Sequence, residues 1–234
     1  MATPQLLAAG GLDYIVYDYL AEITMSIMAR ARARDQNRGF ATDFVDAVLK
    51  PHLVDIAAQG VKLISNAGGV NPQACAAVAV QLIEDAGLDL TVAVVSGDDL
   101  MLHKAAFAQR GFVELFSDQD FPDPAGIASI NAYLGAFPIA RALVLGADIV
   151  ITGRCVDSAV TLGACIDAFG WKPDEFDRLA GGSLAGHILE CGPQATGGNF
   201  TDWHEVADSL VNIGYPIAEA VSYTHLTLPT IYSV

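Results

Sequence analysis

The chain has 234 residues, 53% hydrophobic and 17% charged, so it can bury a sizeable core and is too apolar to be disordered. Its 12 basic and 27 acidic residues give a formal net charge of −15, which excludes nucleic acid and anionic membranes as natural partners. Four cysteines without a C-x-x-C pair indicate a reduced protein, and the absence of a basic and apolar leader predicts a cytoplasmic location.

Short apolar runs alternate with helical stretches along the chain. The first half of the series predicts a strand at 12–18, helices at 21–33 and 43–58, a strand at 61–65, and a helix from Pro72 to Gly87. The second half predicts a strand at 91–95, helices at 100–109 and 131–145, a strand at 148–151, and helices at 156–169 and 174–191. This alternation predicts an α/β fold: an open, mostly parallel sheet with helices on both faces. No two glycines are spaced G-x-G, so these Rossmann-like layers are expected without a dinucleotide fingerprint.

Three segments stand outside this alternation. Four arginines between residues 30 and 38 end the second predicted element, where we interpret them as solvated charges that complement the helix dipole rather than as a nucleic-acid site. Residues 118–126 are acidic and hold two prolines, which predicts a surface loop that is a candidate cover for a site. Residues 1–220 are expected to form a single α/β domain, whereas residues 221–234 look like a translated sequencing adapter and are expected to be a non-native tail.

Three of the predicted strands, 61–65, 91–95 and 148–151, run into glycine-rich polar turns, and such turns meet at one edge of a parallel sheet. Four residues near these turns are candidates for proton exchange: Asp98, Asp157, Glu190 and His187. Because adjacent side chains diverge, we expect one of Asp98 and Asp99 at most to face the site and the other to cap the next helix. His187 and Glu190 are spaced i, i+3 and share a helical face, as a base and its orienting partner do, although an ordinary histidine fits the spacing too.

Anion-binding candidates come from the same turns. They are Asn66, Gly68, Gly69, Asn71, Arg154, Gly197, Gly198 and Asn199. Backbone and side-chain amides there suit an anion or a developing oxyanion, but turn formation alone also explains these residue types. Arg154 either grips a carboxylate or phosphate, or pairs with Asp157. For Cys155 and Cys191, structural roles are favoured over a thiol nucleophile.

No cofactor is required by these motifs, and one metal is an alternative. Oxygen ligands suit a hard cation, so Asp98, Asp157 and Glu190 form a candidate set for Mg²⁺. In that interpretation the three carboxylates bind the ion instead of exchanging a proton. The choice between the two chemistries depends on whether the fold brings these side chains together.

Seven motifs, taken in order, resemble the N-terminal domain of the acyclic terpene utilisation family. They are Leu12-Asp-Tyr14, Leu20-Ala-Glu22, the turns 66–72 and 97–99, and the segments 131–136, 152–158 and 190–200. The resemblance implies truncation at both ends and a catabolic enzyme of acyclic terpenoid or branched-chain acid breakdown. That enzyme would act on a small carboxylate or acyl-CoA by hydratase, lyase or isomerase chemistry. Alternatives are a non-catalytic accessory subunit of an acyl-CoA carboxylase system, a magnesium-dependent enzyme on a phosphorylated or CoA-linked substrate, and assembly as a homo-oligomer.

Overall fold

Four parallel strands form one sheet in the part of the chain that the computed structural model describes, residues 2–221. The strands are β1 (Tyr14–Tyr17), β2 (Lys62–Ser65), β3 (Val92–Val95) and β4 (Ile149–Thr152), in the spatial order β1-β2-β4-β3. In register, Ile15 pairs with Leu63, and Leu63 pairs with Ile149. The predicted open parallel sheet is therefore confirmed. Residue 1 and residues 222–234, which include most of the expected tail, lie outside the described residues.

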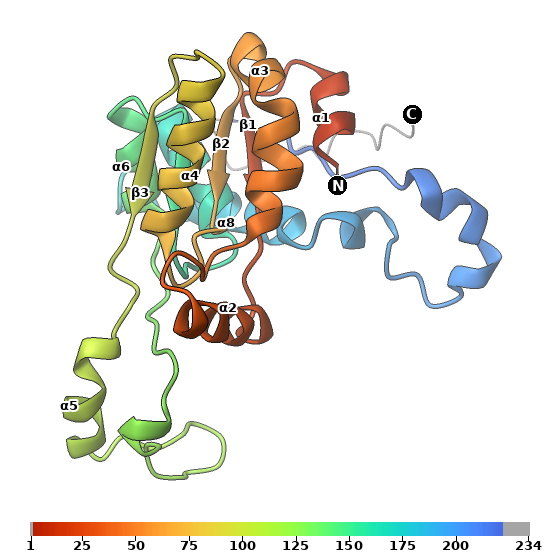
Figure 1. Ribbon diagram of the computed structural model, residues 1–234. Helices are drawn as coiled ribbons and strands as arrows, with labels where there is room; N and C mark the ends of the chain where they lie inside the picture. Colours follow the sequence, from red (N-terminus) through yellow and green to blue (C-terminus); the bar gives the residue numbers. More distant parts are fainter. Residues whose placement is uncertain (1, 222–234) are drawn as a thin grey trace.

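Helices cover both faces of this sheet (Figure 1). One face carries η1 (Phe44–Leu49), α3 (Lys50–Gln59) and α4 (Pro72–Asp85), with α2 (Glu22–Arg34) below the carboxyl ends of the strands. The other carries α6 (Phe137–Val144), α7 (Ala159–Phe169) and α8 (Phe176–Glu190). Consecutive side chains of β2 enter opposite cores, since Leu63 belongs to the first and Ile64 to the second. Both strand faces are apolar because both are buried, as expected for a parallel sheet.

Pro51 splits the predicted helix 43–58, as expected. Residues Phe44–Leu49 form a π-helix, and the α-helical hydrogen-bonding pattern begins at Lys50. Pro51 lies in the first turn of α3, where a missing N–H costs little. A short amino-terminal helix, α1 (Thr3–Ala9), packs against α3 and was not predicted.

The predicted helix 131–145 is correct only in its second half. Residue Asn131 forms a bridge with Asp99, and Leu134 forms one with Cys155, so this part of the chain is extended. The helix α6 begins at Phe137, one residue before Pro138. The bridges to Asp99 and Cys155 hold residues 131–134 extended, which outweighs the apolar periodicity of this segment, and Pro138 lies in the first turn of α6, where proline is favoured.

Between β3 and α6 the chain leaves the sheet as a projecting segment, residues 101–130, which we call the arm (Figure 1). It contains η2 (Met101–His103), α5 (Lys104–Gln109) and η3 (Pro124–Gly126). The predicted acidic loop 118–126 belongs to the arm and lies at the surface. Its residues are absent from the lining of the cavity described below, so they do not cover it.

The remaining described residues follow α8 as three short 3₁₀ helices, η4 (Gly192–Thr196), η5 (Trp203–Glu205) and η6 (Ala207–Asn212), and an extended segment. Among the described residues no helix combines the length and the apolarity needed to cross a membrane. The apolar residues between 137 and 152 fold as α6 followed by β4.

Candidate functional site

The carboxyl ends of all four strands carry polar side chains that gather at one edge of the sheet. Asp18 follows β1, Asn66 follows β2, Asp98 follows β3, and Arg154 follows β4. Two contacts tie neighbouring strand ends together: the Asn66 amide donates to Asp18 at 2.6 Å, and the Arg154 backbone N–H donates to Asp98 at 2.8 Å. The predicted clustering of turns is therefore present, with Asp18 added to it.

Three carboxyl groups converge at this edge. Asp18, Asp157 and Glu190 each place a carboxylate oxygen within 4.8 Å of the others. They come from three separate elements: the end of β1, the turn after β4, and the last residue of α8. We call them the carboxyl cluster. Sequence reasoning selected Asp157 and Glu190 but took Asp98 as the third member, whereas the fold supplies Asp18.

The cluster holds more negative charge than its surroundings compensate. Burial raises the pKa of Asp18, against the lowering effect of its hydrogen bond from Asn66. Burial also raises the pKa of Glu190, and the neighbouring Asp157 carboxylate raises it further. These are the two causes expected when carboxyl groups share a partly desolvated site. Asp18 and Glu190 are therefore poised to hold protons at a higher pH than ordinary carboxyl groups.

Arg154 holds Asp157 in place. Its guanidinium donates to Asp157 at 2.5 Å and to the Cys155 carbonyl at 2.9 Å, and lies 4.0 Å from the centre of the Tyr133 ring. The Tyr133 hydroxyl donates in turn to Glu22 of α2. Arg154 is only 4% exposed and does not line the cavity. Of its two predicted roles, the ion pair with Asp157 is the one that the structure contains.

Asp98 and Asp99 diverge as predicted. Asp98 is 3% exposed and accepts from the Arg154 backbone N–H and from the Asn131 amide, both at 2.8 Å. Asp99 instead caps η2 by accepting from the Met101 backbone N–H. The carboxylate of Asp98 lies over Gly153, where a Cβ would come within 2.4 Å of it. Asp98 thus positions the Arg154 turn and is not one of the three converging carboxyl groups.

The predicted anion-binding loop 66–71 is occupied by internal contacts. Asn66 is fully buried, donates to Asp18 and accepts from the Tyr19 backbone N–H at 2.7 Å. The Asn71 amide donates to two backbone carbonyls of residues 36 and 38. Gly68 allows close packing, because a Cβ there would lie 2.4 Å from the Thr152 carbonyl oxygen. Gly69 has φ of +55° against Met28, a turn conformation that suits glycine. The loop therefore orients Asp18.

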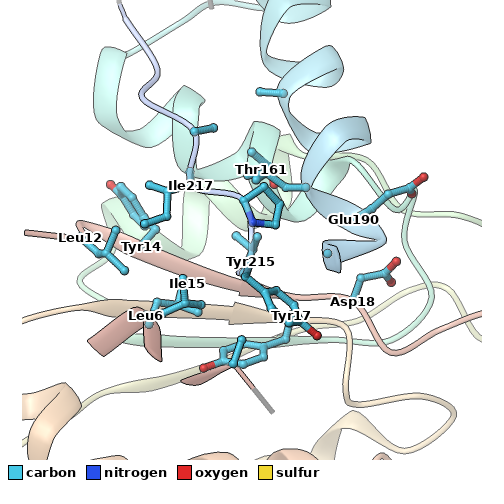
Figure 2. A pocket seen from close by; sticks show the side chains of 18 of the residues that line it. Leu6, Leu12, Tyr14, Ile15, Tyr17, Asp18, Thr161, Glu190, Tyr215 and Ile217 are labelled. Carbon is cyan, nitrogen blue, oxygen red and sulfur yellow. The ribbon is translucent and has the colours of Figure 1, made fainter. Parts of the chain in front are cut away.

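A cavity of about 1380 Å³ runs along β1, the edge strand of the sheet (Figure 2). Asp18 and Glu190 lie at one end of it, and Leu6 and Leu12 lie at the opposite end (Figure 2). Small side chains of α7 and α8, such as Ala164 and Ala185, leave the space open. The cavity therefore joins the carboxylates of Asp18 and Glu190 to a body lined mainly by aliphatic and aromatic side chains, with the carboxylate of Asp13 beside Leu12.

The glycine-rich turn at residues 197–199, which follows η4, reaches this cavity. Gly198 and Asn199 line it, and Gly197 precedes them with φ of +102°. Of the predicted binding residues, these lie beside the open space, whereas Asn66, Gly68, Gly69 and Asn71 support the strand ends. The preceding element, η4, contacts α8 and so keeps these residues close to that helix.

His187 pairs with Glu190, as the i, i+3 spacing predicts. Its Nδ1 lies 3.1 Å from a Glu190 carboxylate oxygen, and the imidazole is largely exposed. This contact lowers the pKa of Glu190, but burial and Asp157 have larger effects in the opposite direction. The exposed imidazole of His187 therefore lies between the Glu190 carboxylate and solvent.

The cysteines fit structural roles. Cys155 is fully buried, and burial raises its pKa to about 11. Cys191 is exposed, yet burial of its thiol and the nearby Glu190 raise its pKa too. A nucleophilic thiol needs a lowered pKa, so neither cysteine has the environment of a nucleophile.

The raised pKa values predict how stability depends on pH. A carboxyl whose pKa is higher in the folded than in the unfolded chain destabilises the fold above both values, and the penalty disappears below the unfolded pKa, near 3.8 for Asp and 4.5 for Glu. We expect Glu190→Gln to melt at a higher temperature than the parent chain at pH 8, with the difference vanishing near pH 4. Melting curves across this range test it. Glu84→Gln, on the exposed side of α4, is the control, and a pH-independent gain in Glu190→Gln would contradict the prediction.

Asp18 was missed as a site residue in the sequence. It is the last residue of the predicted strand 12–18, whereas β1 ends at Tyr17 in the structure, so Asp18 begins the turn at the carboxyl end of its strand as Asn66 does after β2. The turn after β1 lacks the glycines that marked the other turns, which explains the omission.

Comparison with known proteins adds a family match. The family model described as "Acyclic terpene utilisation family protein AtuA" matches residues 1–226. No curated protein and no solved structure matches the chain. The chemistry of the site therefore has to be argued from its own geometry.

Proposed function

We propose, since this chain belongs to the acyclic terpene utilisation family, that it is an enzyme of acyclic terpenoid breakdown that performs acid-base chemistry on a branched acyl thioester. Membership of the family implies involvement in acyclic terpene utilisation. The observation that supports the catalytic part is that two members of the carboxyl cluster, Asp18 and Glu190, line one end of the cavity along β1.

The shape of the cavity supports an apolar, elongated ligand. Leu6, Leu12 and Ile15 line its body, while Asp18 and Glu190 stand at its far end (Figure 2). Ligand sites that combine an apolar lining with a few convergent polar groups are the usual form for small molecules. A branched hydrocarbon chain would lie in the body and present its reacting carbons to the carboxyl cluster.

The charge of the cluster favours a thioester over a free acid. Three carboxylates face one guanidinium, that of Arg154, so full ionisation leaves two uncompensated negative charges. A ligand carboxylate would add a further like charge at this point, which is unfavourable. A thioester carries no charge at its carbonyl, so this end of the cavity suits a thioester carbonyl better than a free carboxylate.

The residues divide into acid-base and positioning roles. One ionised carboxylate, Asp18 or Glu190, would take a proton from the carbon next to the thioester carbonyl, and its protonated neighbour would return one to the substrate. Asp157 raises the proton affinity of Glu190 and is held by Arg154. Asn66 and Asp98 act indirectly, because they orient Asp18 and the Arg154 turn.

A divalent cation is the second way to compensate the same charge. The three carboxylates offer only oxygen ligands, which suit Mg²⁺. This alternative keeps Asp157 and Glu190 of the set predicted from sequence and replaces Asp98 by Asp18. It differs from the proton-exchange proposal in one measurable respect: Mg²⁺ alone would stabilise the folded chain.

The test is ligand-induced stabilisation of the full chain. Branched and terpenoid acyl-CoA thioesters, the matching free acids, and CoA alone are compared, each with and without Mg²⁺. We expect a thioester to raise the melting temperature in a concentration-dependent way, because a ligand bound only by the folded state stabilises it by about 2.7 kcal/mol at a hundred times its Kd. The rise should exceed that caused by the matching free acid.

Three other outcomes are informative. Stabilisation by Mg²⁺ alone that is lost in Asp18→Asn would replace proton exchange by the metal alternative. Equal stabilisation by thioesters and CoA alone would show that the acyl chain is not recognised. The absence of stabilisation by all ligands would overturn the proposal in favour of the accessory subunit.

A further inference from the structure

The arm exposes apolar side chains that its own fold cannot cover. None of residues 101–130 is buried. Phe107 contacts Phe112 and Phe121 in a small aromatic group, but Leu115 and Phe116 at the tip point away from any core, and Phe116 is 89% exposed. A contiguous exposed apolar patch on a projecting segment is typical of a protein interaction site.

The tip of the arm is also acidic. From Gly111 to Ala140 the sequence contains no Lys or Arg, whereas Glu114, Asp118, Asp120 and Asp123 are carboxylates. Glu114 is used locally to cap residues 116 and 117, and Asp123 caps Ala125. The side chains of Asp118 and Asp120 remain exposed beside Leu115 and Phe116.

One surface of the same chain has the complementary character. On α2, Ile23, Ile27, Arg30 and Arg34 are exposed and follow the i, i+4, i+7, i+11 spacing of a single helical stripe. The stripe is apolar at its start and basic at its end. In a chain of net charge −15, such a basic surface is where an acidic segment meets attraction instead of repulsion.

We propose that the arm tip, residues 112–120, docks on the α2 stripe of a second copy of this chain. Leu115 and Phe116 would cover Ile23 and Ile27, and Asp118 and Asp120 would face Arg30 and Arg34. Because each copy carries one arm and one stripe, two such contacts close a two-fold dimer. Within one chain the arm points away from the body and leaves the α2 stripe uncovered (Figure 1).

A second copy of this chain is the expected occupant, because the arm tip and the α2 stripe complement each other both in apolar surface and in charge. An apolar tip alone fits many partners, and a basic stripe alone fits any acidic one. Here each surface combines exposed apolar residues with charged ones. The charges are acidic on the arm tip and basic on the α2 stripe.

The test measures the dimer dissociation constant by sedimentation of the full chain. Ile27→Ser and Phe116→Ser are each expected to weaken association at least tenfold. Val54→Ser is the matched control for Ile27→Ser, because Val54 on α3 is 61% exposed and Ile27 is 57% exposed, and it should leave the constant unchanged. All three positions are exposed, so folding is retained.

Charge reversal identifies the pairing. Arg30→Glu with Arg34→Glu should abolish self-association, and so should Asp118→Asn with Asp120→Lys. Asn is chosen at position 118 because the φ there is +53°, which Asn tolerates. Mixing the two variants should restore a dimer through one native contact and one contact of inverted charge, and added salt should weaken that dimer.

A cysteine pair separates docking between copies from closure within one. In a Cys191→Ser background, Ile27→Cys chains mixed with Phe116→Cys chains should form a disulfide-linked dimer on mild oxidation. Cross-linking within single chains that carry both cysteines, in a protein that sediments as a monomer, would overturn the proposal. So would a dimer that is insensitive to every arm and α2 variant.

Discussion

Replacing Asp18 with asparagine is expected to reduce turnover by about 10²–10⁴-fold, the usual contribution of a positioned acid or base. The asparagine carbonyl can still accept from the Asn66 amide and the Leu20 backbone N–H, as the Asp18 carboxylate does. Removing a carboxylate that burial disfavours should leave the free energy of unfolding unchanged or slightly higher. Steady-state kinetics with the thioester found by the ligand screen, together with melting curves, test the two expectations at once.

The matched control for this variant is Asp89→Asn, an exposed residue in the connection between α4 and β3, for which kcat and KM should both stay at the parent values. Glu190→Gln should behave like Asp18→Asn and shift the acidic limb of the pH profile of kcat/KM. A loss of activity accompanied by a loss of stability would point to a structural defect. Full activity in both variants would remove proton exchange from the carboxyl cluster.

Asp98→Ala is expected to lower the free energy of unfolding by about 2–4 kcal/mol. The carboxylate accepts from a buried backbone N–H of Arg154 and from the Asn131 amide, and its removal leaves both donors without their partner. The loss should exceed that of most exposed substitutions severalfold. Urea unfolding of the variant and the parent chain measures the difference.

The neighbouring residue provides the comparison. Asp99→Ala removes a cap from η2 and an exposed contact to Arg32 at 3.5 Å, so it should cost on the order of 1 kcal/mol or less. Asp98→Asn keeps an oxygen acceptor and should lie between the two alanine variants. Equal losses at positions 98 and 99 would contradict the division of roles between these adjacent side chains.

The fold was predictable because its signals are local. Each buried strand is a short apolar run, and breakers such as Pro72 and Gly87 mark the helix between β2 and β3. The start of α6 was misplaced because residues 131–136 carry helical periodicity but are held extended by contacts with Asp99 and Cys155. Such pairings join residues far apart in the chain, and periodicity does not contain them.

The position of the site in the fold was predictable from the sequence, but only some of its residues were. The edge of the sheet, the Arg154–Asp157 pair and the His187–Glu190 pair follow from strand ends and helical spacing. The presence of Asp18 in place of Asp98 in the carboxyl cluster does not follow from the sequence pattern, because it depends on the order of the strands. Asp18 follows β1 and Asp98 follows β3, and these two strands lie at opposite ends of the sheet. Glu190 comes from α8, which packs on α7 beside β1, and thus meets the Asp18 side.

The order of the strands also sets how the chain must assemble. Sheet neighbours are never joined by a short hairpin: β1 reaches β2 through α2, η1 and α3, and β2 pairs with β4 across the whole arm. Chains dominated by such distant pairings fold slowly, since loop closure precedes the contacts that reward it. During that interval the edge of β1 and the aromatic arm are both available to other nascent chains. Synthesis at low temperature or with chaperones present therefore favours the native product over aggregates.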